Sequence, residues 1–524
     1  MIEHEILKYK TIAVVGCSTN PEKPPHHVPK YLKEQGYKII PIHLSADEIL
    51  GEKAYPSLIE VPGEIDVVLI FRPGEEATEI VKHAIEKGAK AVWMQEGIKN
   101  EEAAGLAKNA GLLVVMDKCI RCAHKERHVK EIDKGVCVQG FSAGGLKDGK
   151  NGIALILSDE EADCALMVTA NRVKAAPLLV SAEHAGGKVR GIVANSGNAN
   201  AYTGEEGIND ARQTCELAAG ELGLKAGEFI VASTGVIGRR MDMKFIETGI
   251  KEVAKTLGKS GEASLKAAEA IMTTDTTPKM VSVITTLNTG EKVEIGGICK
   301  GAGMIAPEFN HATMLCFLTT NAYVPEEKLK NVLESAVDQS FDMTVIDGDM
   351  STNDMVVLLA NGLAGNSDID EHFTEALNHV TRELAKRIAR DGEGATKSIE
   401  VEVKNAKSET DARRAARAVV SSNLVKTAIF GEDPNWGRII SALGYSGAEF
   451  NPEKVSLFIE KVCLVKDGKV LAYQDTEELK AAKKALASKE IKITADLNAG
   501  EYSACAYGCD MSPDYVRINA EYTT

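Results

Sequence analysis

Short apolar runs alternate with helical patterns along the first part of the chain. Mostly apolar runs, typical of strands buried on both faces, are followed by segments in which apolar residues recur at helical spacing. Strands that alternate with helices predict βαβ units around a parallel sheet. We therefore expect an α/β domain over residues 1–128, with strands at 11–15, 37–42, 65–71, 91–94 and 112–116 and helices at 29–35, 75–87 and 100–109.

The pattern changes after a short charged segment at 129–137, which we interpret as a linker. From Val138 onward glycine and alanine become frequent, and longer helical patterns alternate with strands rich in β-branched residues. This pattern predicts a second domain, 138–524, of layered α/β or α+β architecture. Helices are expected at 210–221, 243–257, 326–337, 369–390 and 411–422, and strands at 153–157, 191–194, 229–232, 280–286, 314–318, 399–403, 491–496 and 515–519.

Composition places the chain among ordinary globular proteins. It has 524 residues, of which 44% are hydrophobic and 26% charged, and its net charge is −15. That acidic balance lacks the basic field that non-specific nucleic-acid binding requires. Because the apolar runs are short and the N-terminus shows no basic and apolar regions, we expect neither a membrane span nor a signal peptide. Eleven scattered cysteines, several in apolar stretches, predict a reduced, cytoplasmic protein without disulfides.

A turn at the end of the first expected strand carries candidate phosphate-binding residues. Gly16 allows a tight turn and a close approach of the backbone to a phosphate, and Ser18 follows two residues later. The dinucleotide fingerprint with three glycines is absent, so a purely structural turn is an equally good interpretation. Arg72 follows the third strand, and its guanidinium matches phosphate geometry, although a solvated arginine is nearly as good an interpretation.

The wider pattern of the first domain resembles the small CoA-binding domain family. The resemblance rests on Gly16-Cys17-Ser18, on residues 31–37 and 71–73, and on residues 91–103. It implies a Rossmann-like domain that holds CoA or acetyl-CoA, with Gly16, Ser18 and Arg72 as its candidate contacts.

The end of the first domain carries four residues of zinc-binding types, Cys119, Cys122, His124 and His128. A single residue separates Cys122 from His124, which is closer than the usual spacing of zinc fingers. The spacing therefore disfavours a zinc site, and we predict no metal and no required cofactor.

The second domain contains motifs of small and polar residues in a distinctive order. Small residues from Lys300 to Pro307 precede Thr313, which opens an apolar strand. The other strings cover residues 169–177, 195–201, 232–238, 271–276, 431–438 and 518–524. In this order, from Val138 to the C-terminus, they resemble the glutamate N-acetyltransferase and ornithine acetyltransferase family of arginine biosynthesis. The stretch between Lys300 and Thr313 is two residues longer than the usual run of that family.

The resemblance implies a self-processing acetyltransferase with Thr313 as its nucleophile. Cleavage between Ala312 and Thr313 would divide the domain into an α part, 138–312, and a β part, 313–524. The freed α-amine, with an ordinary pKa of roughly 7.7–8.0, would be the base that activates the hydroxyl. An acetyl-Thr intermediate would then carry acetyl from N2-acetylornithine to glutamate. Without the flanking motifs, Thr313 would be interpreted as a β-branched residue that opens a strand.

Other site residues follow from the same resemblance. Thr234 and Gly235 match the oxyanion-binding pair, although Ser-Thr-Gly is also common in turns. Lys300 would bind the α-carboxylates, and Glu432 would bind the ornithine ammonium. The remaining substrate contacts that the family implies are Thr273, Asn519 and Thr524, whereas we interpret the matching Arg172, Lys174 and Arg438 as structural.

Two other functions remain open at this point. A self-processing aminopeptidase or amidase shares the nucleophile, but the strings at Lys300 and Glu432 and the C-terminal tail favour the acetyltransferase. A non-enzymatic CoA sensor would need a degenerate second domain, whereas its motifs are intact. The resemblance also implies a heterotetramer of two α and two β chains, and it leaves open whether acetyl-CoA is a second acetyl donor.

Overall fold

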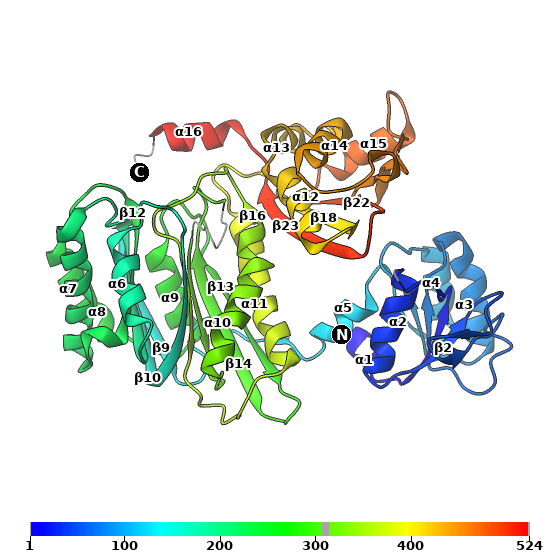
Figure 1. Ribbon diagram of the computed structural model, residues 1–524, viewed down its shortest axis with the longest axis horizontal. Helices are drawn as coiled ribbons and strands as arrows, with labels where there is room; N and C mark the ends of the chain where they lie inside the picture. The colour runs from blue at the N-terminus through cyan, green and yellow to red at the C-terminus, as the bar shows by residue number, and fades with distance from the viewer. Residues whose placement is uncertain (1, 22, 307–313, 522–524) are drawn as a thin grey trace. The chain divides into compact units, whose positions relative to one another are not determined.

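The computed structural model describes every residue except 1, 22, 307–313 and 522–524, and it leaves undescribed the side chains of residues 125 and 126. The chain divides into two compact units, Met1–Arg127 and His128–Thr524 (Figure 1). Among the described residues, no helix combines the length and the apolar character that a membrane span needs.

The first unit is built on a five-stranded sheet whose neighbouring strands all run parallel, in the order β2-β1-β5-β6-β7. The sheet strands are β1 (Thr11–Val15), β2 (Lys38–Ile42), β5 (Val67–Ile70), β6 (Ala91–Met94) and β7 (Leu113–Val115), and a small hairpin adds β3 (Glu48–Ile49) and β4 (Glu52–Lys53). The helices are α1 (Ile2–Ile6), α2 (Pro24–Glu34), α3 (Ala77–Glu86), α4 (Glu101–Asn109) and α5 (Ile120–Glu126).

Helices cover both faces of this sheet. Along β1, Ala13 and Val15 belong to the core beneath α3 and α4, while Ile12 and Val14 belong to the core beneath α1, α2 and α5. This double burial explains why the strands are continuous apolar runs rather than alternating patterns. The predicted parallel α/β sheet is confirmed.

The second unit contains a mixed nine-stranded sheet in the order β12-β11-β10-β17-β15-β14-β13-β8, with β9 paired to β10. Its strands are β8 (Lys130–Glu131), β9 (Phe141–Asp148), β10 (Asn151–Val168), β11 (Val189–Asn198), β12 (Phe229–Val236), β13 (Lys279–Thr286), β14 (Lys292–Lys300), β15 (Leu315–Thr320) and β17 (Met355–Ala360). Its helices are α6 (Ala176–His184), α7 (Gly204–Leu222), α8 (Met243–Ala254), α9 (Gly261–Ile271), α10 (Glu326–Asp338) and α11 (Glu371–Arg390).

The central strand β15 is buried on both faces. Cys316 and Leu318 point into the core formed with α10 and α11, whereas Leu315 and Phe317 point into the core that contains α9. The layered α/β arrangement predicted for this part of the chain is therefore confirmed, with the nine-stranded sheet between helical layers.

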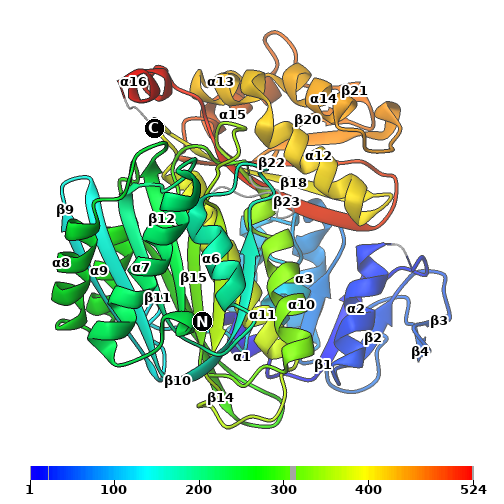
Figure 2. The ribbon, with the colours of Figure 1, turned by 60° about the vertical axis from the view of Figure 1, so that its left-hand side comes forward.

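A seven-stranded sheet, in the order β16-β23-β18-β22-β19-β20-β21, completes the second unit (Figure 2). Its strands are β16 (Thr344–Val345), β18 (Ser398–Ala406), β19 (Ser456–Ile459), β20 (Val462–Lys466), β21 (Lys469–Val470), β22 (Glu490–Asp496) and β23 (Tyr502–Cys509). The helices of this part are α12 (Glu409–Ser421), α13 (Asn423–Phe430), α14 (Trp436–Tyr445), α15 (Glu477–Ala485) and α16 (Pro513–Glu521).

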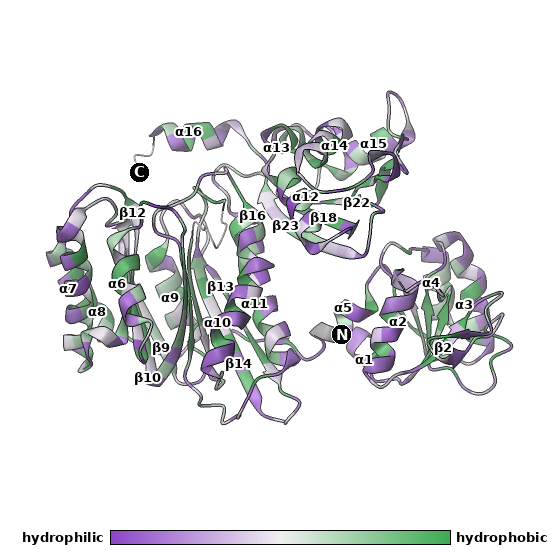
Figure 3. Cartoon of the chain, in the orientation of Figure 1, coloured by the Kyte–Doolittle hydropathy of each residue, from purple (hydrophilic) through white to green (hydrophobic). Residues whose placement is uncertain are grey.

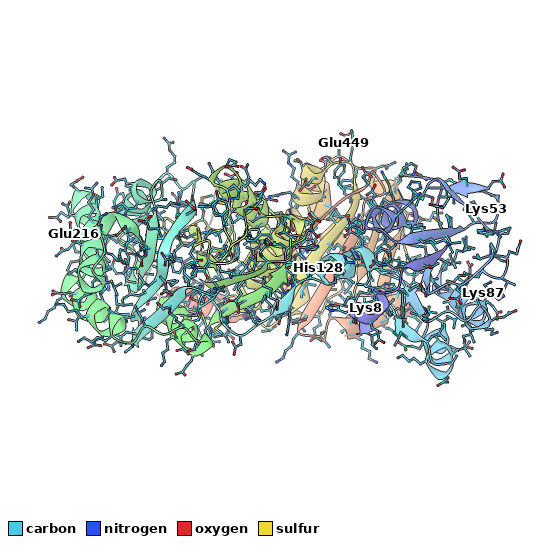
Figure 4. The ribbon with its side chains drawn as sticks, turned by 90° about the horizontal axis from the view of Figure 1, so that it is seen from below. Lys8, Lys53, Lys87, His128, Glu216 and Glu449 are labelled. Carbon is cyan, nitrogen blue, oxygen red and sulfur yellow. The ribbon has the colours of Figure 1, made fainter. Side chains whose placement is uncertain are left out.

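The surfaces of the helices follow the expected polarity. The helices α7, α8, α10 and α11 show alternating polar and apolar bands in Figure 3, and their buried residues recur at helical spacing. The labelled Glu216 and Glu449 point outward in Figure 4, and both are exposed.

Two segments differ from the sequence-based expectation. Residues 515–519 were expected to form a strand, but they lie within α16. Pro513 starts this helix, where its missing N–H costs nothing, and Ser512 Oγ accepts a hydrogen bond from the Asp514 N–H at 3.1 Å. The segment expected to be a linker, 129–137, packs on the second unit, because β8 pairs with β13 and Lys134 Nζ lies 2.8 Å from Glu294 Oε1.

The contact between α9 and β9 generates a test of the fold. A Cβ atom on Gly145 in β9 would lie 2.1 Å from the Lys266 carbonyl oxygen of α9. We expect Gly145→Ala to destabilise the protein by about 1–3 kcal/mol, because the backbone of α9 or of β9 must move to make room for the added methyl group. The control is Gly220→Ala in α7, where a Cβ meets no atom within 4 Å, and where alanine should be neutral or stabilising by roughly 0.5–1 kcal/mol. Equal midpoints of urea denaturation for the two variants would contradict this account.

Candidate functional site

A pocket of about 250 Å³ in the second unit gathers five of the six predicted site residues that the structure describes in that unit. It lies at the end of β12, the loop after α9, the end of β14, the loop before β17 and the helix α16. Figures 1 and 2 both show α16 beside the end of the sheet that carries β12. The predicted site residues that line this pocket are Thr234, Gly235, Thr273, Lys300 and Asn519.

The backbone at Thr234 and Gly235 is tightly constrained. Gly235 has φ +131°, and a Cβ atom there would lie 2.4 Å from the Gly197 carbonyl carbon, so only glycine fits. Asn353 Nδ2 donates hydrogen bonds to the Ala199 oxygen at 2.6 Å and to the Ser233 oxygen at 2.8 Å. These contacts fix β12 against β11 and hold the Thr234 hydroxyl at the pocket wall.

Lys300 supplies a buried cation next to that hydroxyl. It is the last residue of β14, and its Nζ donates to Thr234 Oγ1 at 3.3 Å. Burial lowers the pKa of the Lys300 ammonium, and the nearby Asp275 carboxylate opposes this shift. An ammonium in this position is suited to bind a carboxylate or to stabilise negative charge that develops during a reaction.

The register of β14 and β15 brings the strand after Thr313 to the same place. Lys300 pairs with Leu315, and Met314 accepts a hydrogen bond from the Met355 N–H at 2.8 Å. The strand β15 therefore begins beside Lys300. The proposed cleavage residues Ala312 and Thr313, the longer loop before them and the terminal Thr524 lie outside the described residues.

Acidic groups form another wall of the pocket. Asn519 Nδ2 of α16 donates to Glu393 Oε2 at 2.8 Å. Asp347 accepts hydrogen bonds from the N–H groups of Met304 and Ile305, at 2.6 and 2.9 Å, and burial raises the pKa of its carboxyl group. A pocket with an ammonium on one wall and carboxylates on another is suited to an amino acid, which carries both charges.

Glu432 does not line this pocket. It follows α13 with φ +54°, and its carboxylate accepts a hydrogen bond from Lys397 Nζ at 2.9 Å. The described residues therefore bring five of the predicted site residues together, and they place Glu432 in an ion pair with Lys397 instead.

Two other pockets in the second unit, of about 340 and 400 Å³, share Lys386, Glu400 and Tyr507. Their charged side chains already pair with one another, as Lys386 does with Glu400 at 3.4 Å. None of the predicted site residues lines either pocket. The motif residues and their mutual contacts therefore single out the pocket at Lys300, although it is smaller.

In the first unit the structure brings Gly16 and Arg72 together. Gly16 follows β1 with φ +85°, and a Cβ atom there would lie 2.9 Å from Arg72 Cδ. The strand order reverses between β1 and β5, and such a switch point is where open α/β sheets bind ligands. The half-exposed Arg72 guanidinium donates to both carboxylate oxygens of Glu76, at 2.8 and 2.7 Å. Ser18 Oγ accepts a hydrogen bond from the Asn20 N–H at 3.1 Å.

The four residues considered for zinc have other contacts. His124 is buried, and its Nδ1 lies 2.9 Å from the Tyr31 hydroxyl oxygen. The Cys122 side chain hydrogen-bonds to Cys119, which lowers the pKa of the Cys119 thiol to about 6. His128 belongs to the second unit, where its ring stacks on His372 with centroids 3.6 Å apart. Across the described residues, no group of three or more His, Cys, Asp or Glu side chains is placed to hold a metal ion.

Several residues of the pocket were missed in the sequence. Asp347, Asn353, Glu393 and Tyr515 line it, but none belongs to the strings used for the family resemblance. The polar run from Asp347 to Asp354, directly before the apolar strand β17, was an available signal. Glu393 follows a long amphipathic helix and shows no such signal.

Comparison with known families assigns a family to each part of the chain. Residues 138–524 match the model of the ArgJ family, and residues 10–125 match the model of a CoA binding domain. Because the first match covers more than half of the chain, the protein belongs to the ArgJ family. Both resemblances inferred from the sequence motifs are thereby confirmed.

Curated relatives carry acetyltransferase names. A glutamate N-acetyltransferase of Methanocaldococcus jannaschii is 52% identical, over 76% of this chain and 100% of that protein. That of Methanothermobacter thermautotrophicus is also 52% identical, over 74% and 97%. The arginine biosynthesis bifunctional protein ArgJ of Symbiobacterium thermophilum is 49% identical, over 72% and 93%. The prediction that this chain is an acetyltransferase is confirmed at the level of the family.

Proposed function

We propose that this protein transfers the acetyl group of N2-acetylornithine to glutamate, in arginine biosynthesis, through an acetyl ester on Thr313. The observation that carries the proposal is that Lys300 and Thr234 meet at one pocket, while the register of β14 pairs Lys300 with Leu315 at the start of β15. The names of two curated relatives, both glutamate N-acetyltransferases, support glutamate as the acetyl acceptor.

The proposed reaction begins with self-cleavage: Thr313 Oγ attacks the Ala312 carbonyl, the peptide C–N bond breaks to leave an ester and a free α-amine, and water hydrolyses the ester to free Oγ. The freed α-amine of Thr313 accepts the hydroxyl proton while Oγ attacks the acetyl carbonyl of N2-acetylornithine. The amide C–N bond breaks, and the proton passes to the nitrogen of the leaving ornithine. The neutral amine of glutamate then attacks the ester carbonyl and gives a proton to the Thr313 α-amine, the bond to Oγ breaks, and the α-amine returns that proton to Oγ.

Charge develops on the carbonyl oxygen in both steps. The Thr234 hydroxyl and the Gly235 N–H are our proposed donors to that oxygen, since both residues line the pocket on a rigid strand end. Lys300 would bind the α-carboxylate that both amino acids share. Thr273, Asn519 and Thr524 complete the proposed substrate contacts. The family resemblance is the ground for Glu432 as the group that binds the ornithine ammonium; it lies outside the lining of the pocket and would first have to leave its ion pair with Lys397.

We also propose that the processed protein assembles from two α and two β chains in the cytoplasm. A self-processing amidase remains the alternative for the same nucleophile. Both Lys300 and Glu393 line the pocket, and their opposite charges match the carboxylate and the ammonium of an amino acid. This match favours transfer between two amino acids.

The first test concerns processing. Scaling 56.1 kDa by 312 and 212 of 524 residues gives fragments of about 33 and about 23 kDa. N-terminal sequencing of the smaller fragment should begin at Thr313. We expect Thr313→Ala to stay intact and inactive, and Thr313→Ser, which keeps a hydroxyl, to be cleaved. A fully active enzyme that remains a single chain would exclude this mechanism.

The second test concerns Thr234. Thr234→Val keeps the volume of the side chain but removes the hydroxyl, and we expect kcat to fall by roughly 10²–10³ because one oxyanion donor is lost. Thr234→Ser retains the hydroxyl and is the matched control, with kcat close to that of the wild type. Steady-state kinetics with glutamate as acceptor decide the matter, and a folded Thr234→Val enzyme with unchanged kcat would reject the assignment.

For the first unit we propose that Gly16, Ser18 and Arg72 bind CoA or acetyl-CoA at the switch point. These residues fit a phosphate, because Gly16 keeps the turn open beside a half-exposed guanidinium. The bound thioester would supply acetyl groups to the second unit as a direct donor, or binding would report acetyl-CoA levels to it.

Calorimetry of the full chain with acetyl-CoA tests the proposed CoA site of the first unit. Arg72→Ala should weaken binding about 10- to 100-fold, as expected for a charge-assisted hydrogen bond. Glu76→Gln should strengthen binding, because it releases the guanidinium from its ion pair. Lys82→Ala is the matched control, since Lys82 forms a similar exposed pair with Glu79. Absence of binding, or equal affinities of Arg72→Ala and Lys82→Ala, would refute this site.

A further inference from the structure

A buried network of charges lies directly behind the pocket at Lys300. Its centre is Asp275, whose side chain is fully buried. Asp275 Oδ1 accepts hydrogen bonds from Lys279 Nζ and from the Gly301 N–H, both at 2.7 Å, and Oδ2 accepts one from the Thr273 N–H at 3.1 Å. One carboxylate thus joins two segments of the chain, its own loop at residues 273–279 and the turn at Gly301.

The second carboxylate of the network is Asp391. It lies 2.5 Å from Lys279 Nζ and accepts hydrogen bonds from the N–H groups of Thr276 and Thr277 at 3.0 and 3.3 Å. Asp391 therefore secures the far side of the same loop, but it is not a lining residue of the pocket. Of the two carboxylates, only Asp275 accepts hydrogen bonds from the backbone of Thr273, which lines the pocket, and of Gly301, which follows Lys300.

We propose that Asp275 is the positioning residue of this site, holding Thr273 and the turn at Gly301 in place and balancing the charge of Lys300. The inference rests on the proposed role of Lys300 as the cation that binds the α-carboxylate. Asp275 itself acts through these groups and does not line the pocket.

The electrostatics around Lys300 support this role. Burial lowers the pKa of the Lys300 ammonium, and the charge of Asp275 is the largest influence that raises it again. Burial would raise the pKa of the Asp275 carboxyl, but the Lys279 and Lys300 cations lower it to about 2, so it is ionised across the working range. The other groups that act on or beside Lys300 are Lys279, Glu393, Asp354, Lys147 and the thiol of Cys299, whose pKa burial raises to about 12.

The sign of the expected pH effect follows from these charges. Lys300 binds a carboxylate only while it is protonated, so kcat/KM falls as pH rises through its pKa. Removing the Asp275 charge lowers the pKa of Lys300. The fall of kcat/KM at high pH, which is the basic limb of its pH profile, then moves to lower pH. Removing the Lys279 cation raises the pKa of Lys300, which moves the limb the opposite way. A residue with only a structural role would shift the limb in neither direction.

The experiment compares the pH dependence of acetyl transfer from N2-acetylornithine to glutamate in three variants. Asp275→Asn should raise KM about tenfold and move the basic limb down by about one pH unit. Lys279→Gln should move the limb up. Asp210→Asn is the control for loss of a buried carboxylate, because Asp210 pairs with Arg240 and does not line the pocket, and it should leave the profile unchanged.

Each outcome decides the proposal. A folded Asp275→Asn enzyme with the KM and pH profile of the wild type would overturn it. If Asp275→Asn does not fold, Lys279→Gln takes its place, and an unmoved limb in that variant overturns the proposal equally. Failure of the wild type to acetylate glutamate would instead refute the proposed function, so the two failures are distinguishable.

Discussion

The architecture of the site depends on the burial of β15 between two hydrophobic cores. Alternate residues of this strand pack against α10 and α11 on one face and against the α9 side on the other. A strand buried in this way has no freedom to shift its register, because a slip of one residue would exchange the residues of both faces. Its pairing with β14 therefore fixes where the strand begins, and Lys300 lies opposite that point.

The fold was largely predictable because apolar residues in most elements recur at the spacing of a helix or form the short runs of a buried strand. The strand β6 has the bounds expected from its apolar run, and α10 and α11 agree with their helical patterns to within a few residues. The helix α16 was not predictable in this way. It has no buried residue, so the sequence 515–519 shows no helical apolar stripe, and only the position of Pro513 indicated a helix start.

The site was predictable where residues stand in motifs and unpredictable where topology brings them together. Thr234, Thr273 and Lys300 were found through strings that resemble a known family, and the pocket unites them. Glu393 reaches the same pocket from the loop after α11, through contacts that no local pattern encodes. The ion pair of Glu432 with Lys397 is likewise a property of the folded chain.

The docking of α16 has a consequence for how ligands enter. This helix contributes Tyr515 and Asn519 to the pocket but contributes no side chain to a hydrophobic core. Segments with so little buried apolar surface open at a free energy far below that of global unfolding. The wall formed by α16 is therefore the part of the pocket that detaches most readily, and amide hydrogen exchange there should be faster than in the strands beneath it. An opening of this kind would let one amino acid replace another in the reaction that we propose, without movement of the strands that carry Thr234 and Lys300.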